Sequence, residues 1–183
     1  PLHYMESIPV KEVIHTPAGE TVLDFGQNFA GHVVCTRPLS KGTAMTLEFG
    51  EVLQNGNFYH ENYRHAESKF TYVSDGILRE IRPRFTFFGF RYVKVSGLDR
   101  VEAAGFEGRA IYSEMDRTGF IRTGNEKINR LFSNSLWGLK SNFLDIPTDC
   151  PQRDERLGWT GDAQVFSTTA GFHMDTRAFY RKF

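Results

Sequence analysis

The sequence predicts a multidomain, β-then-α fold: an antiparallel β-sandwich followed by the first helices of an α-helical domain. Three observations support this prediction. Short alternating segments separated by turn residues fill the chain from Gly19 to about Ser113. The pattern changes between Met115 and Thr123, and after Asn125 the apolar residues recur at helical spacing. We expect three segments: an entering strand or linker over 1–17, the β-sandwich over 18–114 and the helical part over 115–183.

The β segments are predicted from alternation and from their boundaries. Pro9 and Pro17 flank alternating apolar positions, which is typical of an edge strand or linker. Met45–Phe49 alternates apolar and polar residues with period two, as in a strand with one buried face. Lys69–Val73 and the aromatic Phe85–Val95 are further strands. Turn signals recur at Lys41-Gly42, Asn55-Gly56, Asp75-Gly76 and Gly105.

Helices are predicted in the last third of the chain. Asn125 is expected to cap a helix that ends before Pro147. Its inward residues follow helical spacing: Ile128, Leu131, Phe132, Leu136 and Leu139. A second helix is expected from about Asp162 to Phe172, with Val165, Phe166 and Thr169 facing inward. Asp175 is expected to cap a third helix that carries Ala178 and Phe179.

Composition narrows the classes of partner. The 183 residues carry a formal net charge of zero, which argues against nucleic acid or a membrane surface as the main partner. No apolar run approaches the roughly 20 residues that span a bilayer. With two cysteines, no disulfide scaffold or zinc site is expected and the compartment stays open. Because the chain starts at Pro1 and stops at Phe183 inside a helical pattern, we expect a piece of a longer polypeptide.

The segment from Asp149 to Asp162, DCPQRDERLGWTGD, is the chemically richest part of the chain. Close carboxylates repel one another and resist burial, so a segment built only to fold does not concentrate them in this way. A site that protonates one atom and holds several hydroxyl groups needs such a cluster. The paired arginines would keep most of these acids ionised. The four acids are Asp149, Asp154, Glu155 and Asp162.

This segment resembles the signature of bacterial α-L-rhamnosidases. Two upstream segments agree with the resemblance: Asp24–Gly31 (DFGQNFAG) is similar to the opening of the β-sandwich domain that precedes the catalytic domain in these enzymes, and Pro83–Val93 (PRFTFFGFRYV) is similar to a later strand of that domain. The three motifs occur in the family's order and span nearly the whole chain. The acidic motif is the most specific of the three.

The resemblance implies an inverting glycoside hydrolase whose catalytic domain is an (α/α)6 barrel, here truncated after its first helices. It implies that Glu155 is the general acid and that Asp149, Arg153, Trp159 and Asp162 bind the rhamnose hydroxyls and ring face. The general base would lie beyond Phe183, in the remainder of the polypeptide. The implied substrates are rhamnose-containing glycosides or polysaccharides with terminal α-L-rhamnose. This chemistry requires no metal or organic cofactor.

Each site residue also has a structural interpretation that the residues leave open. Glu155 could be a solvated acid in a salt-bridged loop, and Asp154 the structural partner of an arginine. Asp149 could be a turn carboxylate, Asp162 a helix N-cap, and Trp159 a core residue. The alternative function is therefore a non-catalytic carbohydrate-binding or structural β-sandwich module with an acidic connector.

Overall fold

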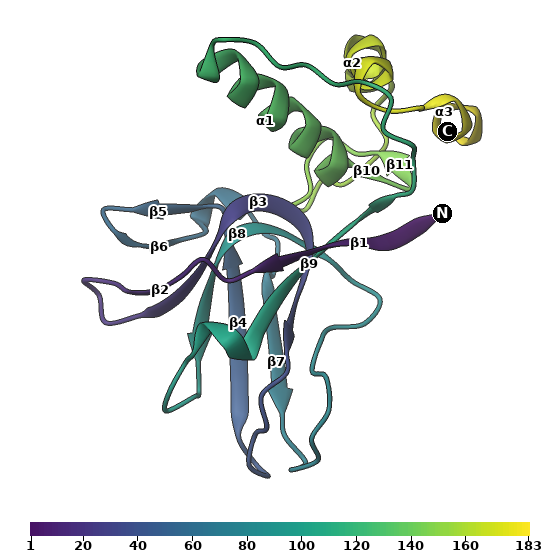
Figure 1. Ribbon diagram of the computed structural model, residues 1–183. Coiled ribbons are helices and arrows are strands. Elements are labelled where there is room, and N and C mark those ends of the chain that lie inside the picture. The colour runs from purple at the N-terminus through teal and green to yellow at the C-terminus, as the bar shows by residue number, and fades with distance from the viewer.

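The computed structural model describes residues 1–183 as a β part with a helical part lying across one end of it (Figure 1). The strands of the β part are β1 (Leu2–Pro9), β2 (Glu12–His15), β3 (Thr21–Cys35), β4 (Ala44–Gly50), β5 (Val52–Gln54), β6 (Asn57–Tyr59), β7 (Lys69–Val73), β8 (Phe88–Ser96) and β9 (Phe106–Ser113). Short 3₁₀ turns lie at Glu61–Tyr63 (η1) and Ala103–Gly105 (η2). The remaining elements are α1 (Glu126–Asn142), the hairpin β10 (Phe143–Leu144) and β11 (Ile146–Pro147), α2 (Thr160–His173) and α3 (Arg177–Lys182).

The prediction of an antiparallel β domain followed by helices is confirmed. The main ladder is one seven-stranded sheet in the order β1-β9-β3-β8-β4-β7, with β2 paired to β3. It is a single continuous sheet that curls on itself, where the sandwich prediction had expected two separate sheets (Figure 1). The predicted entering segment therefore contains two strands, of which β1 forms one edge of the sheet.

Two local features of the β part depend on glycine. In β3 the register shifts between Asp24 and Phe29, around Gly26 with φ +71°, and an irregularity of this kind bends a strand and increases its twist. The β5–β6 hairpin turns on Asn55 and Gly56, both at positive φ. An Asn-Gly pair is the preferred two-residue hairpin turn, so the turn predicted here is confirmed.

The concave side of the sheet is filled by aromatic rings. The main apolar cluster contains 18 buried residues. Phe49 and Phe88 stack with ring centroids 4.0 Å apart, and Phe90 packs edge-on to Phe49 at 4.9 Å. Burial of each such ring stabilises the fold by about 1.5–3 kcal/mol. Met45, Leu47 and Phe49 are all fully buried, as the period-two alternation predicts.

The helices are confirmed, but their apolar faces are only partly buried. The Asn125 side chain accepts a hydrogen bond from Lys127 N and caps α1 as predicted. Leu136 and Leu139 are buried, whereas Leu131 at the other end of the same predicted face is 68% exposed. Ile128 is also exposed. The predicted inward face is therefore wrong at Ile128 and Leu131, whereas the half-buried Phe132 packs on His173 of α2 with ring centroids 4.3 Å apart.

The second helix begins two residues earlier than predicted, at Thr160. Its buried residues are Ala163, Ala170 and His173, while Val165, predicted to face inward, is 84% exposed. That prediction is wrong because apolar residues occur on more than one side of this helix. Thr176, not Asp175, occupies the N-cap position of α3, so the predicted cap is wrong by one residue, although the Asp175 carboxylate accepts a hydrogen bond from Arg177 N at 3.2 Å.

A buried polar contact ties α1 to the sheet. Lys140 is buried, and its ammonium group contacts Glu6 of β1. Glu6 Oε1 also accepts a hydrogen bond from the Tyr112 hydroxyl of β9 at 2.5 Å. Burial raises the pKa of Tyr112, and its hydrogen bond to Glu6 adds to this effect. Trp137 of α1 packs on the apolar cluster of the sheet. None of the helices combines the length and the apolar character needed to cross a membrane.

Candidate active site

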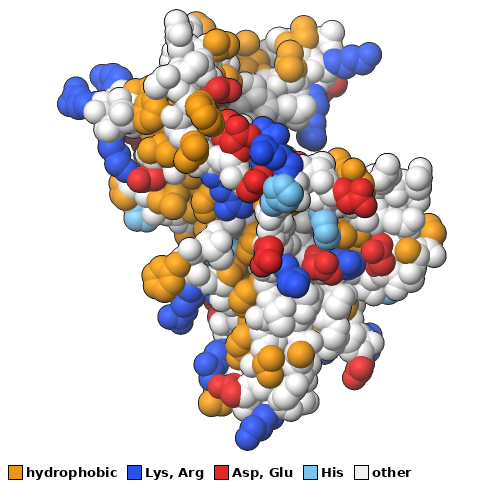
Figure 2. All heavy atoms as spheres, turned by 180° about the vertical axis from the view of Figure 1, so that it is seen from behind, with side chains coloured by type: hydrophobic (Ala, Val, Ile, Leu, Met, Phe, Trp, Pro, Cys, Tyr) orange, Lys and Arg blue, Asp and Glu red, His pale blue; other side chains and the backbone are white.

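The acidic segment forms an irregular loop between β11 and α2, and its two ends are pinned together. Thr148 pairs with Gly158 in an isolated antiparallel bridge. The Thr148 amide and hydroxyl both donate to Asn142 O at the end of α1, at 2.8 and 3.0 Å. The loop lies at the junction of the helical and β parts, and Figure 2 shows acidic, basic and histidine side chains gathered across the middle of the face seen there.

The carboxylate of Glu155 lies between two arginines. Its Oε2 is 3.0 Å from Arg64 Nη1 and 3.0 Å from Arg153 Nη2. The Glu155 side chain is 32% exposed, so this is a half-buried cluster open to solvent. Asp154 Oδ1 lies 3.4 Å from Arg64 Nε, which makes Asp154 the partner of an arginine, as predicted. The structural interpretation of Glu155 as an ion-paired loop acid and its assignment as a proton donor both fit this geometry.

Asp149 is the most buried carboxylate of the segment. Its side chain is 10% exposed, and Arg153 Nη2 lies 3.6 Å from its Oδ2. The same oxygen accepts a weak hydrogen bond from the Cys150 thiol at 3.2 Å, whereas Oδ1 is buried with no hydrogen-bond partner. Buried polar atoms are rarely left unpaired, so Asp149 Oδ1 is available to accept a hydrogen bond from a ligand. Cys150 is itself buried, and burial raises the pKa of its thiol.

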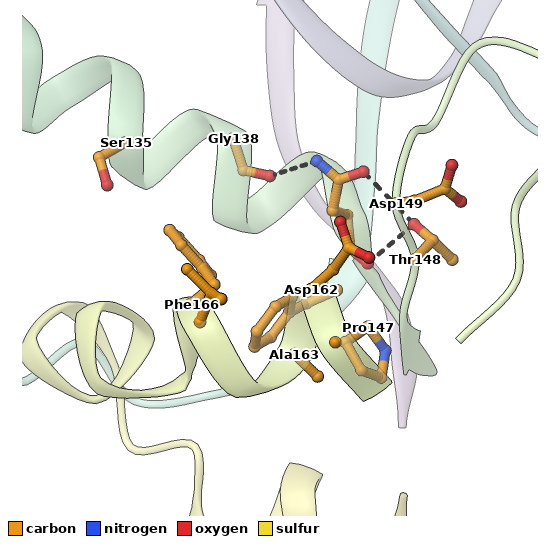
Figure 3. A pocket seen from close by; sticks show the side chains of 12 residues that line it. Ser135, Gly138, Pro147, Thr148, Asp149, Asp162, Ala163 and Phe166 are labelled. Carbon is orange, nitrogen blue, oxygen red and sulfur yellow. Dashed lines mark hydrogen bonds between the residues drawn. The ribbon is translucent and has the colours of Figure 1, made fainter. Parts of the chain in front are cut away.

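Asp149 and Asp162 line one cavity of about 540 Å³ between α1 and α2. Figure 3 shows that Ser135 and Gly138 come from α1, Thr148 and Asp149 from the loop, and Asp162, Ala163 and Phe166 from the first turns of α2. In this view the carboxylate of Asp162 points toward the side chain of Thr148. Asp162 lies inside the first helical turn and Trp159 occupies the N-cap position. The N-cap interpretation of Asp162 is therefore wrong.

The structure separates the predicted site residues into two neighbouring groups. Arg153 and Glu155 line a second hollow of about 420 Å³ against Phe87 and Phe88 of the β part. Trp159 lines neither space and is 43% exposed, so its interpretation as a core residue is wrong. Arg153 links the two groups, because it contacts both Asp149 and Glu155. No group of three or more His, Cys, Asp and Glu side chains is arranged to hold a metal ion.

Three β-part residues that sequence reasoning did not select fix this loop to the sheet. Arg64 pairs with Glu155 and Asp154. Phe87 O accepts a hydrogen bond from Arg156 Nη1 at 3.0 Å, and the Arg156 guanidinium lies over the Phe87 ring at 4.4 Å. Arg156 thus has a structural role. Gly89 lies directly against the backbone of Pro151 and Gln152. These contacts join parts of the chain that are distant in sequence, so no local sequence pattern marks these three residues.

Two family models match consecutive parts of the chain. The bacterial alpha-L-rhamnosidase concanavalin-like domain matches residues 14–112, more than half of the chain. The bacterial alpha-L-rhamnosidase 6 hairpin glycosidase domain matches residues 116–183. The chain belongs to the bacterial α-L-rhamnosidase family. The family resemblance inferred from the three motifs is confirmed.

Individual relatives agree with the family models. An alpha-L-rhamnosidase of Formosa agariphila is 43% identical over 176 residues, which is 93% of this chain and 19% of the relative. The crystal structure of a native rhamnosidase from Aspergillus terreus superimposes with a TM-score of 0.96 at 38% identity, over the whole chain and 22% of that structure. The Streptomyces avermitilis α-L-rhamnosidase complexed with L-rhamnose gives a TM-score of 0.95 at 39% identity, over the whole chain and 18% of that structure. The chain thus spans about a fifth of the length of these relatives.

Proposed function

We propose that the polypeptide containing this chain is an α-L-rhamnosidase that hydrolyses terminal α-L-rhamnosides with inversion. Family membership supports the reaction class. The single observation that supports the assignment of the site is that the Arg153 guanidinium contacts both Asp149 and Glu155. The Asp149 carboxylate is buried and has one oxygen without a hydrogen-bond partner, whereas the Glu155 carboxylate is half-buried. Hydroxyl recognition and proton donation need these two kinds of carboxylate side by side.

The chemistry divides among the residues as follows. Glu155 donates the proton to the departing glycosidic oxygen, which is a poor leaving group when it is unprotonated. Asp149 Oδ1 and Asp162 accept hydrogen bonds from rhamnose hydroxyls. Arg153 contacts both Asp149 and Glu155 and fixes their positions relative to each other. Trp159 offers a ring face to the apolar side of the sugar. A carboxylate from elsewhere in the polypeptide, about 6.5–9.5 Å from Glu155, activates the water that attacks from the opposite face.

The domain assignment is part of the same proposal. Residues 18–114 correspond to the β-sandwich domain that accompanies these catalytic domains, and the strands of 1–17 belong to the same curled sheet. Residues 115–183 correspond to the first helices of an (α/α)6 barrel. The exposed apolar residues Leu131 and Val165 support this assignment, because helices of a barrel bury such residues against neighbouring helices.

The test is Glu155→Gln in the intact enzyme that carries this chain, assayed on methyl α-L-rhamnoside by NMR. Glutamine keeps the shape of the side chain but has no acidic proton, so kcat should fall about 10²- to 10⁴-fold, while L-rhamnose binds with unchanged Kd. In the wild-type reaction the first sugar released should be the β-anomer. Glu102→Gln, an exposed ion-paired glutamate of the β part, is the matched control.

Undiminished hydrolysis by the Glu155→Gln enzyme would refute the acid assignment and favour the salt-bridged connector of a non-catalytic module. Initial release of the α-anomer would refute inversion but would leave the acid assignment of Glu155 intact.

A further inference from the structure

A cation of the β part reaches the carboxylate proposed as the general acid. Arg64 and Glu155 are separated by 91 positions in the sequence, and Arg64 Nη1 donates a hydrogen bond to Glu155 Oε2 at 3.0 Å. The Nε atom of the same guanidinium lies 3.4 Å from Asp154 Oδ1. A planar guanidinium can serve two neighbouring carboxylates in a fixed geometry. The guanidinium therefore fixes the direction in which Glu155 points.

The backbone that presents Arg64 is held firmly. Arg64 directly follows η1 and has φ +60°, a conformation that non-glycine residues adopt only where their surroundings enforce it. The preceding residue, Tyr63, is 1% exposed, and its hydroxyl donates a hydrogen bond to Gly89 O at 2.6 Å. This anchor fixes the start of the Arg64 side chain relative to strand β8.

The acidic loop is fixed to the same strand. A Cβ atom added at Gly89 would lie 2.8 Å from Pro151 C and 2.9 Å from Gln152 N, so strand and loop are in direct backbone contact. Two residues earlier, Phe87 O accepts the hydrogen bond from Arg156. The turn that carries Arg64 and the loop that carries Glu155 are thus both attached to Phe87–Gly89. This shared attachment sets the distance between the two side chains.

The contacts select one oxygen of the carboxyl group. Arg64 and Arg153 both approach Oε2 of Glu155, which leaves Oε1 to carry the proton. When that proton moves to the glycosidic oxygen, the carboxyl group becomes a carboxylate and its new negative charge faces two guanidinium groups. An interaction that strengthens as charge develops accelerates the step instead of merely tightening ground-state binding.

We propose that Arg64 is a positioning residue for the general acid: it holds Glu155 by Oε2 and stabilises the carboxylate that proton donation leaves behind. This inference rests on the proposed role of Glu155. It makes the β part a contributor to the chemistry of the neighbouring helical part. A purely structural ion pair on the surface would contribute little to stability and nothing to a specific step.

The experiment compares two substrates in the intact enzyme. Methyl α-L-rhamnoside needs a proton on its leaving oxygen, and 2,4-dinitrophenyl α-L-rhamnoside does not. Arg64→Met should lower kcat on the methyl glycoside roughly 10- to 100-fold, which is part of the rate enhancement that a general acid provides. On the dinitrophenyl glycoside it should lower kcat by less than about 3-fold. KM should change little on either substrate. Arg64→Lys should recover most of the loss because it keeps a cation near Oε2.

Two further variants separate positioning from folding. Arg79→Met removes an exposed, ion-paired arginine of the same β part and should behave like wild type on both substrates. In the Glu155→Gln background, Arg64→Met should cause no additional loss, because the group on which it acts has gone. If Arg64→Met does not fold, as judged by circular dichroism, Arg64→Gln and Arg64→Lys carry the same substrate comparison.

Equal losses on the two substrates, a full additional loss in the Glu155→Gln background, or no loss at all would overturn the positioning role. The proposed function is judged separately, from Glu155→Gln alone. A dead Glu155→Gln enzyme together with a fully active Arg64→Met enzyme would refute only the role of Arg64. Retained hydrolysis of the methyl glycoside by Glu155→Gln would refute both.

Discussion

His32 of β3 is the least expected buried side chain of the sheet. It is 4% exposed, and neither ring nitrogen has a hydrogen-bond partner. Tyr4 packs against it edge-on, with ring centroids 6.0 Å apart. Burial lowers the pKa of His32 to about 4, and the positive charge of Arg82 acts in the same direction. The imidazole is therefore neutral in the folded chain throughout the physiological range.

This histidine should make the fold sensitive to mild acid. An unfolded histidine takes up a proton below about pH 6.5, whereas His32 in the folded chain does so only near pH 4. The free energy of unfolding should therefore fall by roughly 2 kcal/mol between pH 7 and pH 5 from this group alone. Urea unfolding at several pH values measures the slope. His32→Leu, which removes the titrating ring, should show a shallower slope, and identical slopes would contradict the prediction.

At the scale of elements, strand β8 does more than complete the sheet. Its first residues support both the acidic loop and the turn that carries Arg64, through Gly89, its carbonyl oxygen and the carbonyl of the preceding Phe87. Residues on the other side of the same strand stack in the apolar cluster. The position of the proposed acid thus depends on the packing of the sheet.

Gly89→Ala should disturb this junction. The added methyl group would lie closer to Pro151 and Gln152 than side-chain carbon atoms approach backbone, so either the strand or the loop has to move. Overpacking of this kind costs about 1–3 kcal/mol, and we expect that loss in urea unfolding together with reduced hydrolysis by the intact enzyme. Gly124→Ala, whose methyl group would meet no atom within 4 Å, is the control. Wild-type stability of Gly89→Ala would show that the contact is looser than described.

Local patterns predicted these elements well, whereas contacts across the chain were not predictable. The alternation at Met45–Phe49 and the cap at Asn125 are encoded within a few residues, and both are confirmed. The inward face of α2 was predicted wrongly at Val165, because only the packing of other elements determines which apolar side is covered. The contact between Arg64 and Glu155 leaves no pattern in the sequence, since Arg64 resembles an ordinary surface charge and lies 91 positions from Glu155. The motif predicted the chemical character of the loop but not its division between two cavities.

In the molecule as a whole, the two parts have cores of different size. The apolar cluster of the sheet contains 18 buried residues and that of the helices contains six. Phe172 of α2 is 69% exposed. Since buried apolar area is the main source of stability, the helical part depends more on its neighbours than the sheet does.

Hydrogen exchange on the 183-residue chain should reveal this difference. Amides of β3, β8 and β9 should exchange by global unfolding, and those of α2 and α3 at least about tenfold faster through local opening. Mass spectrometry of peptic fragments measures both sets in one sample. Equal protection of α2 and β3 would mean that the chain unfolds as a single cooperative unit.

The Lys140–Glu6 contact limits where this chain can be joined to part of another protein. A chimera with its crossover between the sheet and α1 would part an ammonium group from a carboxylate at a site largely withdrawn from water, and a charge left alone there is strongly unfavourable. A transplanted sheet therefore has to bring α1 with it, and the splice point belongs beyond the acidic loop, because Glu155 and Arg156 contact the sheet as well.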